Sequence, residues 1–362
     1  MKIALCVTIF FVSLALAQEN NPSFPRPVPP VPPIPPLPPG ASEGFDSLDA
    51  NKDGRVTREE FEDRFRKNPQ HSNPWQKANH PPGAPNVPAA GLQLPVRPEP
   101  GIYGHSIYYA VSTDGLEFAS VGANNHSPVL EHASVPDALL QPDGSFWIYF
   151  VNGEPGKHGI WVAKPDDNGV YQKTAAISLP SFAGDIGESW GVDPDIVRLS
   201  DGSLQLTYLG NFVTGPQNPQ KQSFSSIRAA FSRDGLNFTS AVELLKAPKA
   251  ADPSLLVVKP DLWLLCMVGE GVLLSTSTDG KTFSPATATL PMPRIPELVL
   301  LPDGRIGLYI AESMGIVRFS STDYTHWKFD GFVKIKDQPR RAEHPSVVYS
   351  NGKFHLFYLV VG

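Results

Sequence analysis

The sequence of 362 residues is poor in cysteine, in long apolar runs and in net positive charge. Its cysteines are Cys6 and Cys266, and Cys6 lies in a predicted leader, so the mature chain has no partner for a disulfide. Stability must therefore come from burial of a core, in which we expect Cys266 to be a small buried hydrophobe. The net charge of −6 argues against a nucleic-acid partner, because such a partner requires a basic face.

The first 17 residues have the pattern of a secretory signal peptide. Lys2 provides a charged start, residues 3–14 form a short apolar stretch, and residues 15–17 form a small-residue cleavage site. The apolar stretch is too short to span a bilayer, and no later segment is long and apolar enough to do so. The sequence therefore predicts a protein that has no membrane span and is secreted or periplasmic.

Proline, in contrast, is abundant, and many of the 39 prolines fall in two segments. Residues 18–40 predict a stiff, extended spacer, and residues 68–100 predict a second Pro-rich linker without a periodic apolar pattern. Such segments also serve as ligands for aromatic grooves, which is the alternative interpretation.

Between the linkers, residues 41–67 have the pattern of an EF-hand. The EF-hand loop needs hard oxygen donors at its positions 1, 3, 5 and 12, and a backbone carbonyl at position 7. These positions hold Asp49, Asn51, Asp53 and Glu60, with the carbonyl of Arg55. Apolar residues at helical spacing flank the loop, so we predict a small α-helical unit with calcium as its cofactor. A solvated acidic loop that binds nothing is the alternative.

Two short patterns alternate along residues 101–362. The first, here named the Asp box, is Ser-x-Asp followed by an aromatic residue four positions after the aspartate. Its four copies begin at Ser112, Ser232, Ser277 and Ser321, and a degenerate fifth copy begins at Asp166. We expect the Ser and Asp side chains to stabilise turns through local backbone hydrogen bonds, and the aromatic side chain to pack between sheets.

The second pattern, here named the proline motif, is a proline between short polar or acidic residues at the start of an apolar run. Its five copies are centred on Pro136, Pro194, Pro253, Pro296 and Pro345. Asp-Gly or Asn-Gly dipeptides follow four of these prolines by six or seven residues, which indicates hairpins. Strand-like repeats at this spacing predict an all-β, five-bladed β-propeller.

The series begins with an Asp box and ends with a proline motif, so neither terminal unit is complete. We predict that one blade combines residues 343–361 with residues 104–123, which closes the ring and hides its sheet edges. The other four blades are predicted at residues 132–180, 190–247, 250–291 and 294–336. In an alternative register of the first blade, Ala133 instead of Pro136 matches Pro345.

A propeller places the start of each innermost strand around its central channel, so residues beside the motif prolines are expected to line that channel. They are Val135, Asp137, Asp193, Asp195, Asp252, Glu297, Glu343 and His344. A ring of carboxylates suits acid and base chemistry on a glycosidic bond. A structural cation, or carboxylates that bond nearby backbone groups, explains such a ring equally well.

Parts of this region resemble the five-bladed propeller glycosidases, a superfamily of arabinanases, xylosidases and levansucrase-like enzymes that includes glycoside hydrolase family 43. The resembling stretches are Val192-Asp193-Pro194-Asp195, Asp201-Gly202, residues 207–210 and Asp252-Pro253-Ser254. The resemblance implies an Asp base in the first blade, an Asp that tunes the acid in the second, and a Glu acid in the third. It gives Asp193 the second of these roles, whereas Val135 and Ala251 stand at the base and acid positions.

The candidate catalytic residues are therefore Asp193, Asp252 beside the acid position, and Glu343, which has the acid-like spacing from Pro345 in another blade. Three functions stay open. The protein is an exported propeller that binds a glycan or an extracellular protein at the channel mouth, a glycoside hydrolase with an incomplete acid and base set, or an adaptor that binds a partner through its EF-hand.

Overall fold

A computed structural model describes residues 102–121, 127–157, 159–182, 190–212, 225–290, 294–312, 315–336, 338 and 341–361. All of them belong to the second of the chain's two units, residues 40–362. The predicted leader, both Pro-rich linkers and the EF-hand, with its ligands Asp49, Asn51, Asp53, Arg55 and Glu60, lie outside the described residues. Within the described residues, no helix has the length and apolarity needed to cross a membrane.

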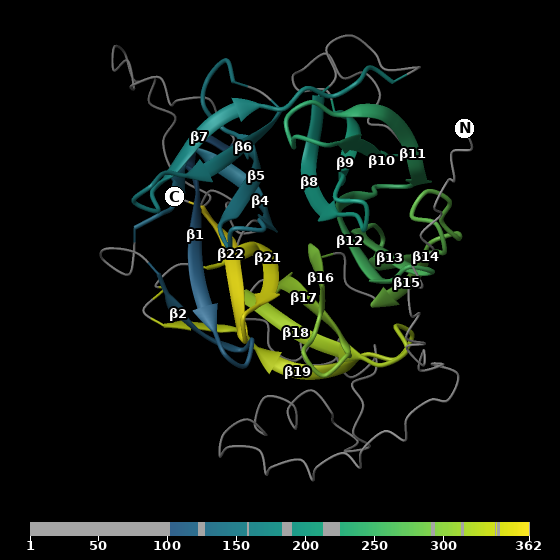
Figure 1. Ribbon diagram of the computed structural model, residues 1–362. Coiled ribbons are helices and arrows are strands. Elements are labelled where there is room, and N and C mark those ends of the chain that lie inside the picture. Colours follow the sequence, from purple (N-terminus) through teal and green to yellow (C-terminus); the bar gives the residue numbers. More distant parts are fainter. Residues whose placement is uncertain are drawn as a thin grey trace, which may run out of the picture. The chain divides into compact units, whose positions relative to one another are not determined.

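The described residues form five antiparallel sheets arranged as the blades of a propeller, preceded by one 3-10 turn, η3 (Ile102–Gly104) (Figure 1). Blades one and two consist of β4 (Ala133–Leu140), β5 (Phe146–Asn152), β6 (Ile160–Pro165), β7 (Tyr171–Ala176), β8 (Trp190–Arg198), β9 (Leu204–Phe212), β10 (Ser225–Ser232) and β11 (Thr239–Ala247). Blades three and four consist of β12 (Ala251–Lys259), β13 (Leu262–Val268), β14 (Val272–Ser277), β15 (Thr287–Leu290), β16 (Pro296–Leu300), β17 (Ile306–Glu312), β18 (Gly315–Ser321) and β19 (Lys328–Phe332). The predicted five-bladed, all-β architecture is confirmed.

The fifth blade joins the two ends of the described chain, as the repeat order predicted. It consists of β21 (Glu343–Ser350), β22 (Lys353–Val361), β1 (His105–Ser112) and β2 (Glu117–Ser120). Strands β1 and β22 pair antiparallel along their whole length, from His105 opposite Val361 to Ser112 opposite Phe354. Two short strands extend this sheet, because β3 (Leu130–Glu131) pairs with β1 and β20 (Lys334–Lys336) pairs parallel with β2. The chain thus closes its own ring.

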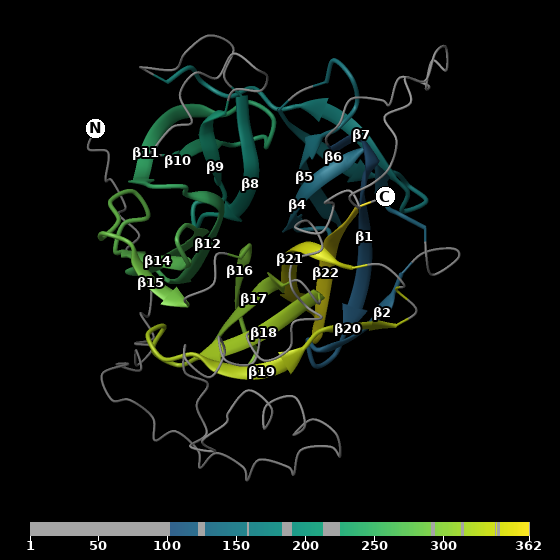
Figure 2. The ribbon, with the colours of Figure 1, turned by 180° about the vertical axis from the view of Figure 1, so that it is seen from behind.

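The first strand of each blade lies next to the channel. Strands β4, β8, β12, β16 and β21 each contact the corresponding strand of the next blade. Both views of the ribbon show these five strands around the centre of the ring (Figures 1 and 2). Because every proline motif opens one of these strands, the five motifs meet at the channel.

Strand composition follows position within a blade. Strand β22 is central in its sheet, and residues 356–360 are an unbroken apolar run in which every side chain is buried. Strand β7 lies at the outer edge, where half-buried and exposed side chains alternate. Continuous apolar runs arise where neighbouring blades cover both faces of a strand, and alternation arises where water covers one face.

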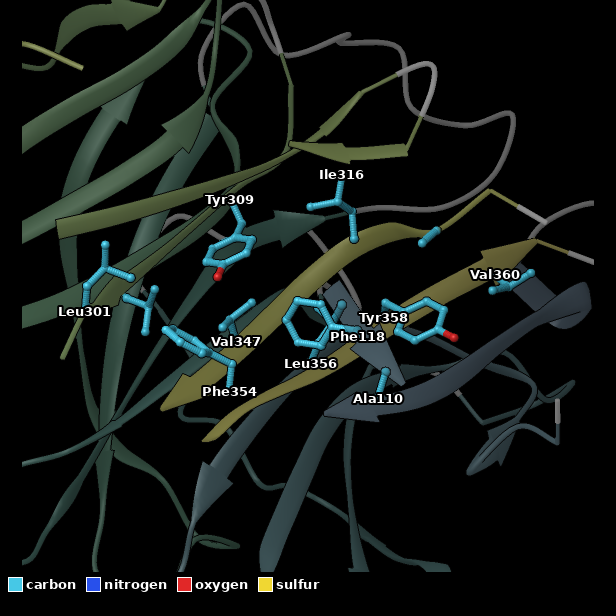
Figure 3. Packing of buried hydrophobic residues seen from close by; sticks show 12 residues of the cluster. Ala110, Phe118, Leu301, Tyr309, Ile316, Val347, Phe354, Leu356, Tyr358 and Val360 are labelled. Carbon is cyan, nitrogen blue, oxygen red and sulfur yellow. The ribbon is translucent and has the colours of Figure 1, made fainter. Parts of the chain in front are cut away.

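The hydrophobic core is divided among the five junctions between blades, with one cluster of buried side chains at each. Figure 3 shows the junction of blades four and five, where Tyr309 and Leu301 pack near Phe118, Phe354 and Leu356. Cys266 lies fully buried and unpaired in the cluster between blades three and four, as expected from its apolar surroundings. Burial also raises the pKa of its thiol.

The Asp boxes form turns at the rim and have the predicted structural role. In the box of blade three, Ser277 Oγ donates to Asp279 Oδ1 at 2.9 Å, and the same oxygen accepts the amides of Lys281 and Thr282 at 2.8 and 2.7 Å. The other boxes repeat this pattern, and the aromatic side chain of the box that begins at Ser112 is buried between blades. In the degenerate box, Asp166 instead accepts the amides two and four residues ahead.

Candidate functional site: two layers of side chains in the channel

Each proline motif contributes two side chains to the channel, one before the proline and one after it. The residues before the prolines are half-buried and form a mouth layer: Val135, Asp193, Asp252, Ile295 and His344. The residues after the prolines are buried and form an inner layer: Asp137, Asp195, Ser254, Glu297 and Ser346. This arrangement places Pro136 level with Pro345, so the first of the two registers for blade one is correct.

A bulge in four of the five inner strands separates the two layers. The ladder to the second strand skips from Ser134 to Asp137 in blade one, and it skips at the same place in blades two, three and five. At each bulge the residue before the proline has a positive φ, between 42° and 54°. This backbone conformation is strained for a non-glycine residue, above all for the β-branched Val135. Its repetition in four blades turns the side chain before the proline to the mouth and the side chain after the proline into the channel.

The inner layer joins each blade to the next. Every inner side chain accepts a hydrogen bond from the backbone amide that follows the inner residue of the neighbouring blade. Donor and acceptor are Ile196 and Asp137 (2.5 Å), Leu255 and Asp195, Leu298 and Ser254 (2.9 Å), Val347 and Glu297 (3.0 Å), and Ala138 and Ser346 (3.0 Å). The five bonds form a closed circuit around the channel, so carboxylates that bond nearby backbone groups account for part of the predicted acidic ring.

Three carboxyl groups stand close together in the inner layer. Oxygen atoms of Asp137, Asp195 and Glu297 lie within 4.8 Å of one another, and all three side chains are buried. Burial raises the pKa of Asp137 to about 6. Burial, and next the neighbouring carboxylates, raise the pKa values of Asp195 and Glu297 well above their ordinary range. Burial therefore disfavours the charged form of all three groups, because water does not solvate them.

The mouth layer brings two of the candidate catalytic residues together with a histidine. The backbone amide of Asp252 points at Asp193 Oδ2 at 3.4 Å, and Asp252 Oδ1 lies 3.5 Å from His344 Nε2. Burial, and next the charge of Asp252, raise the pKa of Asp193 to about 8. Burial disfavours the charged form of His344 and by itself lowers its pKa. The hydrogen bond to Asp252 and the nearby carboxylates outweigh this effect, so the pKa of His344 is raised overall.

Glu343, the third candidate, lies one residue farther from its proline. Its Oε1 accepts Arg341 Nη2 at 2.6 Å, and its charge acts on His344 and on His105. His105 comes from β1 and shares a hydrogen bond of 2.8 Å with the hydroxyl of Ser134. Asp193 and Asp252 thus meet in the mouth layer, and Glu343 stands at its edge beside a cation. Their assignment to catalysis stays a prediction.

The described residues of both layers enclose a cavity of about 20 Å³. A buried water molecule needs roughly 10–15 Å³ measured in this way. The cavity therefore accepts a water molecule or an ion, whereas a larger ligand would contact the mouth layer from outside.

Sequence reasoning named the acidic residues of the channel but missed the serines. Ser254 and Ser346 occupy the same position after the proline as Asp137, and both are buried in the inner layer. The signal was present in the motif, since the residue after each proline is in every copy a side chain that accepts hydrogen bonds. The separation into two layers depends on the bulge, which has no signature of its own in a single sequence.

Comparison with known proteins identifies no family for this chain. The sequence matches no protein-family model and no curated protein. Similar solved structures include an N-acetylgalactosamine deacetylase from F. plautii, with 12% identity, a TM-score of 0.47, and coverage of 61% of this chain and 76% of that chain. A family-43 glycoside hydrolase from Bacillus licheniformis is 15% identical, with a TM-score of 0.49, and the match covers 62% of this chain and 48% of that chain.

A third similar structure is a family 117 glycoside hydrolase produced by the marine bacterium Zobellia galactanivorans. It is 11% identical, with a TM-score of 0.46, and the match covers 73% of this chain and 88% of that chain. Sequence identities this low carry no information about the side chains of a functional site. The function of the channel must therefore be argued from its own residues.

Proposed function

We propose that this protein is an exported, calcium-binding propeller that binds a carbohydrate or another extracellular ligand at the mouth of its channel. The observation that carries this proposal is the mouth layer. Three blades contribute Asp193, Asp252 and His344 to one group of polar side chains that solvent reaches in part, since the side chains of Asp252 and His344 are each 17% exposed. The carboxyl groups of the inner layer, in contrast, are buried.

The chemistry of the mouth suits a ligand rich in hydroxyl groups. Each carboxylate offers two oxygens that accept hydrogen bonds, and an imidazole offers a donor or an acceptor. Val135 and Ile295 complete the layer with apolar surface, which is the usual combination in small-molecule sites. A sugar ring presents both hydroxyl edges and apolar faces, so it matches both kinds of side chain.

A binding screen with matched variants tests the proposal. The full chain is tested against a panel of polysaccharides and oligosaccharides by affinity electrophoresis and calorimetry. Asp252→Asn should weaken binding about tenfold, the scale expected for one charge-assisted hydrogen bond. Asp201→Asn, in an exposed turn far from the channel in the fold, should leave the affinity unchanged. Binding that both variants retain would place the ligand elsewhere, and no binding to any glycan would end the carbohydrate proposal.

Hydrolysis is the second candidate, because Asp193, Asp252 and His344 combine two carboxyl groups with a third group able to transfer a proton. Acid and base catalysis requires such groups within reach of one bond. Against it, the positions that the resemblance assigns to the base and the acid hold Val135 and Ala251. Release of reducing sugar from the panel, lost in Asp193→Asn, would support hydrolysis. Binding without any turnover would leave only the binding function.

The calcium part of the proposal rests on the loop from Asp49 to Glu60, in which every ligand position holds a suitable oxygen donor. Glu60→Gln removes the carboxylate that is expected to bind calcium through both of its oxygens. The variant should bind one calcium ion fewer per chain than the parent in equilibrium dialysis. Equal calcium content in both proteins would contradict the EF-hand.

A further inference from the structure

We propose that the inner layer of the channel is a second metal site, in which Asp137, Asp195 and Glu297 hold a divalent cation of the calcium class. This site is separate from the predicted EF-hand loop, and it does not depend on what binds at the mouth. The first observation is the spacing, since ligand oxygens of the three side chains lie within 4.8 Å of one another.

The second observation is an oxygen without a partner. Asp195 is only 6% exposed, and its Oδ1 has no hydrogen bond among the described residues. A buried oxygen left in this state costs free energy, and native structures rarely keep one unless an ion or a water molecule satisfies it. The cluster of three carboxyl groups therefore contains a buried oxygen that is free to bind a cation.

The hydrogen bonds of the two remaining residues favour their charged form. Asp137 accepts Ser346 Oγ on one oxygen and a backbone amide on the other, at 2.8 and 2.5 Å. Glu297 accepts Ser254 Oγ and a backbone amide in the same way, at 2.9 and 3.0 Å. Each of these donors lowers the pKa of the group that it contacts, and so opposes the rise that burial causes.

The three acidic groups also lack a compensating cationic side chain. Among the described residues, no Lys, Arg or His forms an ion pair with Asp137, Asp195 or Glu297. Buried charges are normally paired or coordinate a metal, because isolated ones are too costly to remove from water. A cation between the three carboxylates would supply the missing positive charge.

The donor set selects the kind of cation. Carboxylate and hydroxyl oxygens favour hard cations over zinc or copper, which prefer nitrogen and sulfur ligands. Calcium binds oxygens at about 2.3–2.6 Å, so two of its ligands can lie up to about 5 Å apart, which accommodates the observed spacing. The adjoining cavity of about 20 Å³ has room for a water molecule that completes the coordination shell.

The test uses the full chain carrying Glu60→Gln, so that the predicted EF-hand does not contribute. The protein is saturated with calcium, transferred to metal-free buffer and analysed for bound elements by mass spectrometry. We expect one retained divalent ion per folded chain, and a melting temperature that falls by several degrees when EDTA removes it. Adding Asp195→Asn should abolish both the retained ion and the EDTA response. Adding Asp201→Asn instead, the matched control in an exposed turn, should preserve both.

The outcomes are decisive even if the Asp195→Asn protein does not fold. A folded Glu60→Gln protein that retains no divalent ion and melts at the same temperature with and without EDTA overturns the proposal. Retention of the ion in a folded protein that also carries Asp195→Asn overturns it as well, because the ion then lies elsewhere. Sodium as the only retained element would show a monovalent ion and would equally exclude the proposed site.

Discussion

The Asp boxes at the rim and the inner layer of the channel both pair a serine hydroxyl with an aspartate, but the pKa of the aspartate shifts in opposite directions. In the Asp box at the rim, Ser277 donates to Asp279, and backbone amides together with this hydroxyl lower the pKa of Asp279 to about 2. In the channel, Ser346 donates to Asp137, yet burial raises the pKa of Asp137 to about 6. The hydrogen bonds are similar, so the amount of surrounding water decides the direction of the shift.

The comparison separates two uses of a repeated acidic residue. At the rim, an exposed carboxylate holds a turn together at little cost, because water still solvates its outer oxygen. In the channel, a buried carboxylate connects neighbouring blades and must be offset by other groups. We therefore expect substitutions in the channel to affect stability more than equivalent ones at the rim.

Opening the ring should have the largest effect, since both regions depend on its closure. Deletion of residues 1–120 removes β1 and β2, exposes the edge of β22 and deprives the core of Ile107 and Phe118. We expect an unfolded or aggregated protein in circular dichroism and gel filtration, whereas deletion of residues 1–100 should leave the blades folded. A monomeric, folded fragment that begins at residue 121 would show that closure is dispensable.

Removal of one channel carboxylate should have the next largest effect. Asp137→Ala leaves the amide of Ile196 and the hydroxyl of Ser346 without an acceptor in a buried site, which should cost about 2–4 kcal/mol. Asp279→Ala, its counterpart at the rim, leaves only groups that water can reach and should cost clearly less. Urea denaturation of both variants measures the difference. Equal losses of unfolding free energy would remove the distinction between the two regions.

A finer comparison lies between two turn glycines with positive φ, Gly235 in an Asp box and Gly144 in the hairpin turn between β4 and β5. In Gly235→Ala, the new Cβ would meet the hydroxyl of Tyr149 at 2.5 Å, whereas around Gly144 no atom lies within 4 Å of such a Cβ. Both substitutions strain the backbone by about 1 kcal/mol, and Gly235→Ala should cost about 1–2 kcal/mol more through the clash. Denaturation midpoints decide the order. The reverse order would mean that Tyr149 moves aside without loss.

The smallest effect concerns acid stability at the rim. A carboxylate whose pKa is lower in the folded chain stabilises the fold at pH values above its unfolded pKa of about 3.9. For Asp279, this contribution should disappear as the pH falls from about 4 to about 2. In a curve of melting temperature against pH, Asp279→Asn should therefore flatten the acid limb below about pH 4. The neutral limb should stay parallel to that of the parent. An unchanged acid limb would contradict the role of the box carboxylate.

The sequence predicted the repeats well because each is a local structure. The Asp boxes depend on bonds between residues two to four positions apart, and the Asp-Gly turns depend on a single dipeptide. The closing blade also followed from the sequence, because the order of the two motifs left half a unit at each end. None of these features requires knowledge of distant contacts.

The candidate site was only partly predictable, since its groups meet through the fold. The sequence named Asp193 and Asp252, but the contact of Asp252 with His344 joins residues about 90 positions apart and depends on the circular order of the blades. It also placed Ser254 and Ser346 after their prolines, in the position that Asp137 occupies, but it did not show that these hydroxyls would be buried with the acidic residues. Whether Asp193, Asp252 and Glu343 act on a substrate is a question for the variants proposed above.

By itself, the sequence determined the number of blades, their closure and which residues approach the channel, because the spacing of the motifs encodes all three. The tertiary structure alone decided which acidic side chains face the mouth and which are buried together, because in four of the five blades a bulge at the proline turns the side chain before it to the mouth and the side chain after it into the channel. Burial then fixes the charge behaviour of these groups, and burial is a property of the assembled ring that no single motif contains.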